Sequence, residues 1–158
     1  MLTDIFAFYI VGGNVAKRQV ETKTNNELMK ANIFKIKNLH LGLSSLTVIG
    51  VGLAYGINPN KILPLFFDFK VESVDLKNVF RAIMGLYLGL SFYWAIAIFK
   101  QEYWRNATLI STIFMGTLAF GRIISIIFDG IPSLAFSIGT VLEILFMIWG
   151  IRNLQIKE

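Results

Sequence analysis

The stretch VFRAIMGLYLGLSFYWAIAIF, residues 79–99, contains one charged residue, Arg81. A helix needs about 20 apolar residues to cross the hydrocarbon core of a bilayer, which is roughly 30 Å thick. Transmembrane β-strands instead alternate in polarity over about ten residues. Because the run from 79 to 99 is continuous and long, it predicts a membrane-spanning helix.

Three further segments have the same character, at residues 39–57, 107–128 and 131–151, and their polar exceptions include His40, Arg122 and Glu143. The whole chain is 55% hydrophobic and 16% charged, and its mean hydropathy is +0.63. A soluble domain of 158 residues has too much surface for its volume to bury that much apolar side chain. We therefore predict an all-α fold, a polytopic membrane protein with a bundle of four transmembrane helices.

Composition also excludes several kinds of chemistry. The chain has no cysteine and a single histidine, so disulfides, thiol nucleophiles and iron–sulfur clusters are absent and a histidine-based metal site is not expected. No phosphate-binding glycine loop or nucleophile elbow occurs. We predict no cofactor and no metal. The net charge of +5 does not indicate nucleic acid, because the basic residues flank apolar segments.

The distribution of lysine and arginine predicts the orientation, since basic residues concentrate on the cytoplasmic side of a membrane. Basic residues precede the first span, separate the second from the third and follow the fourth: Lys17, Arg18, Lys23, Lys30, Lys35, Lys37, Lys100, Arg105, Arg152 and Lys157. The opposite side carries only Lys61, Lys70 and Lys77. Both termini are therefore expected in the cytoplasm.

Three regions follow along the chain. Residues 1–37 form a basic segment, and Leu28, Met29, Ile33 and Ile36 recur at helical spacing within it. This pattern predicts an amphipathic helix at the membrane interface, and a partner-docking arm is the alternative. Residues 38–152 form the four-helix domain, and residues 153–158 form a short cytoplasmic tail.

The first external loop is unusually apolar for a tether. It contains the closely spaced Phe66, Phe67 and Phe69, so we expect it to lie at the outer interface and to cover the mouth of the bundle. Ser73 and Asp75 then supply the oxygen and the negative charge that are favoured where a helix begins.

Four charged residues fall in the outer half of the predicted bundle: Arg81, Arg122, Asp129 and Glu143. From a rise of about 1.5 Å per residue, Arg122 and Glu143 differ in depth by only about 6 Å. A lone charge near the bilayer centre costs around 3 kcal/mol on insertion scales, and pairing lowers that cost. We expect Arg122 to meet Glu143 and Asp129, with Arg81 above them.

Helical periodicity supports this grouping, because residues three, four and seven apart share a face. Ser125 lies between Arg122 and Asp129 on one such stripe, and Thr140 lies beside Glu143 on another. Glycines repeat at the G-x-x-x-G spacing that lets helices approach closely, and we predict that these glycines pack inward: Gly52, Gly56, Gly85 and Gly89. His40, Ser44 and Thr47 form a weaker polar stripe on the inner half of the first span.

Two motifs resemble a known family. The patterns N-x-x-R-A-x-x-G and G-R-x-x-S-x-x-x-D-G occur in order at Asn78, Arg81, Ala82, Gly85, Gly121, Arg122, Ser125, Asp129 and Gly130. They are similar to those of small bacterial membrane proteins described as a domain of unknown function, number 4345. The resemblance covers about residues 39–152 and implies a four-helix fold in the bacterial inner membrane. It implies no activity, and the long N-terminal segment departs from the family pattern.

Three functions remain open. The arginines could hold an anionic lipid or amphiphile, because guanidinium groups match phosphate and carboxylate oxygens. The chain could instead be a non-catalytic accessory subunit of a larger membrane complex, or a homo-oligomer. A lipid-modifying enzyme that uses Glu143 or Asp129 as general acid or base ranks last, because neighbouring arginines favour the ionised carboxylate. The sequence identifies neither the ligand nor the partners beyond membrane lipids.

Overall fold

A computed structural model of the protein describes residues 21–25, 27–28 and 37–155. The chain divides into two compact units, residues 1–37 and residues 38–158. In the first unit, the described residues 21–25 and 27–28 are helical and exposed. The remainder of the predicted interfacial segment, apart from Lys37, lies outside the described residues, as do residues 156–158.

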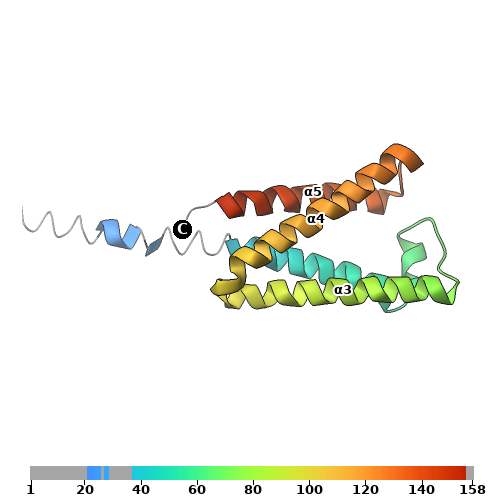
Figure 1. Cartoon of the computed structure of the whole chain (residues 1–158), viewed down its shortest axis with the longest axis horizontal. Coiled ribbons are helices and arrows are strands. Elements are labelled where there is room, and N and C mark those ends of the chain that lie inside the picture. The colour runs from blue at the N-terminus through green and yellow to red at the C-terminus, as the bar shows by residue number, and fades with distance from the viewer. Residues whose placement is uncertain (1–20, 26, 29–36, 156–158) are drawn as a thin grey trace, which may run out of the picture. The chain divides into compact units, whose positions relative to one another are not determined.

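Four helices are long and apolar enough to cross a membrane: Lys37–Gly56, which we call the first span, then α3 (Val74–Phe99), α4 (Gln101–Asp129) and α5 (Leu134–Gln155). Each runs antiparallel to the one before it, so the first span begins and α5 ends at the same end of the bundle (Figure 1). The predicted all-α fold with four spans is confirmed. Such a set of helices is typical of an integral membrane protein.

The helix bounds differ most from the predicted spans at the start of α3, the start of α4 and the end of α5. α3 begins at Val74, five residues before the apolar run, because the Ser73 side chain accepts a hydrogen bond from the backbone N–H of Leu76 at 3.1 Å. This is the predicted helix start. α4 begins at Gln101, directly after Lys100, so the turn between α3 and α4 is much shorter than the predicted loop. α5 continues to Gln155, into the predicted tail.

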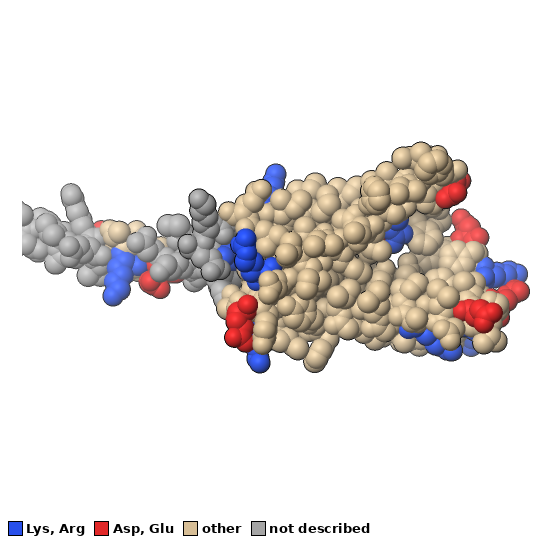
Figure 2. All heavy atoms as spheres, viewed as in Figure 1, with Lys and Arg blue, Asp and Glu red and all other residues tan. Residues whose placement is uncertain are grey.

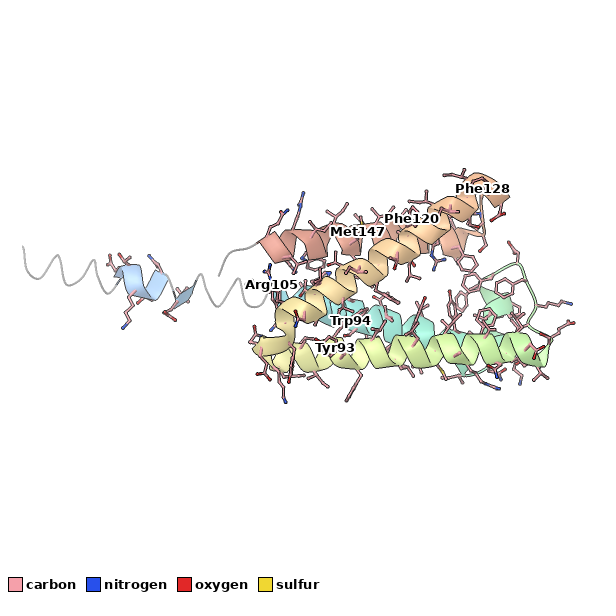
Figure 3. The ribbon with its side chains drawn as sticks, viewed as in Figure 1. Tyr93, Trp94, Arg105, Phe120, Phe128 and Met147 are labelled. Carbon is pink, nitrogen blue, oxygen red and sulfur yellow. The ribbon has the colours of Figure 1, made fainter. Side chains whose placement is uncertain are left out.

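The middle of the bundle presents apolar side chains outward. Phe120 of α4, which is 65% exposed, points away from the other helices (Figure 3). On the face drawn in Figure 2, most charged residues of the bundle gather at its two ends, and one basic side chain is visible in the hollow between them. An apolar band between polar ends is the surface that a bilayer requires.

Inside the bundle, aromatic and small residues fill the contacts between helices. Trp94 of α3 is fully buried and points toward α4, where its ring meets that of Phe114 with centroids 5.6 Å apart (Figure 3). α4 packs along α5. The first span packs on α3, and Ser45 Oγ donates to the carbonyl of Ser91 at 3.0 Å.

The segment between the first span and α3 folds over one end of the bundle, which we call the loop end. It forms the short helix α2 (Pro59–Ile62) and a 3-10 turn, η1 (Leu63–Leu65). Leu63 and Val71 are buried, whereas Phe66 is 58% exposed. Phe67 and Phe69 stack with ring centroids 5.7 Å apart. The predicted covering segment therefore exists, but Phe66 does not take part in it.

Candidate functional site

An ion pair joins α4 to α5 in the half of the bundle nearer the loop end. The Nε atom of Arg122 donates to both carboxylate oxygens of Glu143, at 3.0 and 2.9 Å. The Arg122 side chain is 21% exposed and that of Glu143 is 11% exposed. Two charges in so apolar a place are stable only as a pair, because either one alone would lack both water and a counter-ion.

The surface of α5 is shaped to receive the guanidinium group. Phe136, Gly139 and Glu143 follow one another at spacings of three and four, so they share a face of the helix. The Cζ atom of Arg122 lies 4.9 Å from the centroid of the Phe136 ring, within the range of a cation–π interaction. A Cβ atom built on Gly139 would lie 3.9 Å from this Cζ atom. This is an ordinary van der Waals distance, so the guanidinium lies directly against the α5 face at position 139.

A cavity of about 130 Å³ opens beside this ion pair. Residues of the first span, the covering segment and all three later helices line it: Thr47, Val48, Val51, Tyr55, Phe67, Tyr87, Met115, Leu118, Arg122, Ala135, Phe136, Gly139, Leu142, Glu143 and Phe146. Arg122 and Glu143 are the charged residues among them. The face in Figure 2 is hollowed toward the loop end. For comparison, an apolar cavity of roughly 150 Å³ holds a molecule of benzene.

The other predicted site residues do not join this group. Arg81 and Asn78 of α3 are exposed and do not line the cavity. Asp129 is also exposed, and it accepts a hydrogen bond from Ser125 Oγ at 2.9 Å. The expected four-charge network is therefore wrong: it reduces to the Arg122–Glu143 pair. Periodicity and depth placed all four charges at similar levels, but only packing decides which helix faces meet.

Thr140 is buried on α5, and its hydroxyl bonds within its own helix, so it is not available to a ligand. Its Oγ1 atom donates to the carbonyl of Phe136 at 2.9 Å, within the same helix. This back-bonding satisfies a buried hydroxyl without a partner from another helix.

The four predicted packing glycines divide into two pairs. On the first span, Gly52 and Gly56 lie against α3: a Cβ built on Gly52 would come 3.0 Å from Tyr87 Cβ, and one on Gly56 would collide with Met84. Gly85 and Gly89 of α3 are exposed, and a Cβ on either would meet no atom within 4 Å. Their predicted inward packing is wrong, because α3 turns the Arg81 face outward.

Two tyrosines of the site were not predicted from the sequence. Tyr55 and Tyr87 are buried, line the cavity and lie with ring centroids 6.0 Å apart. Tyr55 lines the cavity together with Arg122. Helical spacing could have predicted Tyr55, because it follows Val48 and Val51 by seven and four residues and so shares a face of the first span with them.

The comparisons with known proteins agree with this architecture. No curated protein and no solved structure was found to match the chain. A family model matches residues 36–152, which include the first span, α3, α4, α5 as far as Arg152, and every residue that lines the cavity. The chain therefore belongs to the family described as Domain of unknown function (DUF4345).

Proposed function

We propose that the protein binds an anionic lipid or another acidic amphiphile, with the head group at Arg122 and an apolar chain in the adjoining cavity. The observation that carries this proposal is the union of one ion pair with an otherwise apolar and aromatic lining. Binding sites for small molecules are typically concave and apolar, with a few polar groups that fix orientation. The cavity fits the end of an acyl chain or a ring, and not a whole diacyl lipid.

The hydrogen bonds of Arg122 explain how it can bind an acidic ligand in addition to Glu143. Glu143 accepts from the Nε atom, and a guanidinium has five N–H donors in total. The terminal nitrogens therefore retain donors for the oxygens of a ligand. Arginine is suited to this task because its planar fork matches carboxylate and phosphate geometry.

The test is native mass spectrometry of the full chain, purified in mild detergent, with phosphatidylglycerol, phosphatidylethanolamine and a fatty acid added one at a time. We expect a saturable adduct with the acidic ligands, weakened at least tenfold by Arg122→Gln. Arg81→Gln is the matched control, since it removes the same kind of charge from an exposed position outside the cavity. Equal losses in both variants would reduce the effect to general charge attraction and would refute the site.

A second candidate is an accessory subunit of a larger membrane complex, and one surface favours it. Arg81, Gly85 and Gly89 share an exposed face of α3, and small residues at this spacing let another transmembrane helix approach closely. Cross-linking in native membranes from positions 85 and 89 tests it. A specific partner that is lost on Gly85→Leu but retained on Arg122→Gln would favour this function over lipid binding.

The orientation belongs to the same proposal. We place the protein in the bacterial inner membrane with both termini in the cytoplasm, so that the loop end and the cavity lie in the outward-facing half. The excess of basic residues before the first span, after α3 and after α5 supports this placement.

A further inference from the structure

A second group of polar side chains is buried in the other half of the bundle, away from the Arg122–Glu143 pair. His40, Ser44, Ser111 and Trp94 are 0% exposed, and Asn153 is 2% exposed. In the part of the chain that the structure describes, one polar atom of each lacks a hydrogen-bond partner: His40 Nδ1, Ser44 Oγ, Ser111 Oγ, Trp94 Nε1 and Asn153 Nδ2. These residues come from all four spans. Buried polar groups almost always have a partner, and ordered water is the usual one when protein atoms are missing.

Several contacts connect part of this group from helix to helix. His40 Nε2 lies 3.1 Å from the carbonyl of Phe146. A Cβ built on Gly150 would collide with Thr112 Oγ1 and would lie 3.2 Å from His40 Nε2. The first span, α4 and α5 therefore meet at Gly150. Ser44 is one turn from His40 toward the loop end, and Asn153 is three residues beyond Gly150 toward the opposite end. Ser111 adjoins Thr112, so the group extends over about two helical turns along the bundle.

This group of residues borders the cavity on the side that faces away from the loop end. Thr47, Met115 and Phe146 line the cavity. Ser44 precedes Thr47 by three residues, Ser111 precedes Met115 by four, and Gly150 follows Phe146 by four, which is about one helical turn in each case.

The chemistry of these groups selects a neutral ligand that both donates and accepts. Since a carbonyl oxygen only accepts, His40 Nε2 carries the hydrogen in its contact with Phe146, and Nδ1 of the neutral ring is left as an acceptor. Trp94 Nε1 and Asn153 Nδ2 only donate, and the serine hydroxyls do both. No carboxylate belongs to the group, and no cluster of three or more metal-ligating side chains of the His, Cys, Asp and Glu types occurs in the described ranges. Water fits this mixture, whereas a cation would face donor N–H groups.

We propose that this layer is a binding site for ordered water molecules that bridge His40, Ser44, Ser111 and Asn153 across the bundle. The site is separate from the lipid-binding site and does not depend on it. Bound water in this group would hydrate the half of the bundle away from the loop end, next to a mainly apolar cavity.

The test measures thermal unfolding of the full chain in lipid nanodiscs for Ser44→Ala, Ser111→Ala and the double variant. If each hydroxyl holds water, each single variant melts about 2–4 °C lower. The double variant then loses less than the sum, because the two serines share bound water. If the group is dry, the single variants should melt at the same temperature as the unmodified protein or higher, because they remove an unsatisfied buried hydroxyl.

Ser125→Ala, at an exposed position of α4, is the control for a serine whose hydroxyl bonds only within its own helix, to Asp129. A high-resolution map of the unmodified protein in lipid provides an independent measurement that does not rely on the variants folding. We expect water density within 3.2 Å of Ser44 Oγ and Ser111 Oγ. A layer without density overturns the proposal. A melting temperature that rises in sodium chloride relative to choline chloride also overturns it, in favour of a cation site.

Discussion

The ring of Phe67 stacks on the ring of Phe136, with centroids 4.1 Å apart and planes 24° apart. Phe67 belongs to the segment that covers the loop end, and Phe136 lies on α5 beside the guanidinium of Arg122. Both phenylalanines line the cavity. The covering segment is therefore attached to the same face of α5 that holds the charged pair, and it closes one wall of the cavity.

Replacing Phe67 with alanine removes this wall. We expect the free energy of unfolding to fall by about 2–4 kcal/mol, below the full core range because Phe67 is only half-buried. Proteolysis within residues 58–73 should also accelerate. Phe66→Ala is the matched control, because Phe66 is exposed and should change both measurements little. Similar losses for the two variants would contradict the assigned contact.

The Arg122–Glu143 pair predicts strong energetic coupling. Glu143→Gln leaves the guanidinium without its counter-ion, and Arg122→Gln leaves the carboxylate without its own, so each single variant should be destabilised by about 2–4 kcal/mol. The double variant restores neutrality and should lose less than the sum, with a coupling of about 1–3 kcal/mol. Thermal unfolding of the four proteins in one detergent measures this cycle. Additive losses would mean that the two charges do not act as a pair.

Glycine substitutions separate buried from exposed positions. Gly150→Ala should destabilise the bundle by about 1–3 kcal/mol, because the new methyl group collides with Thr112. Thr112→Ala in the same chain should restore part of that loss. Gly89→Ala meets no atom within 4 Å and should be neutral or gain up to about 1 kcal/mol through helix propensity. The unfolding temperatures of these three variants, compared with that of the unmodified protein, test the prediction.

The beginning of α3 gives a local prediction. Ser73→Ala removes the side-chain acceptor for the Leu76 N–H and should cost about 1 kcal/mol. Ser73→Asp should retain the cap and the stability, since aspartate is an equally good helix start. Hydrogen exchange at residues 74–77 measures the fraying. No difference between the alanine and aspartate variants would show that the cap contributes nothing.

The proposed orientation can be tested directly, because the chain contains no cysteine. Asn60→Cys lies in α2 at the loop end, and Lys100→Cys lies at the turn between α3 and α4. In intact spheroplasts, a membrane-impermeant maleimide should label the first variant and not the second. Both should react after lysis. The reverse pattern before lysis would place the loop end in the cytoplasm.

Hydropathy and helix chemistry alone determined much of this protein. The long apolar runs required four spans, because a chain of 158 residues has too little interior to bury four such helices away from water. Ser73 marked the start of α3, since a side-chain oxygen at that point accepts a hydrogen bond from one of the first backbone N–H groups. Periodicity also identified Arg81, Gly85 and Gly89 as one face of a single helix.

Only the tertiary structure decided which faces meet. Arg81 and Arg122 are both arginines near the outer end of a span, yet one is exposed and the other pairs with Glu143. Gly52 lies against Tyr87 of α3, whereas Gly89 contacts nothing. In a membrane the lipid is as apolar as the protein interior, so hydrophobicity does not distinguish an inward face from an outward one. That choice depends on the fit of side chains between helices, and a single sequence does not contain it in any local pattern.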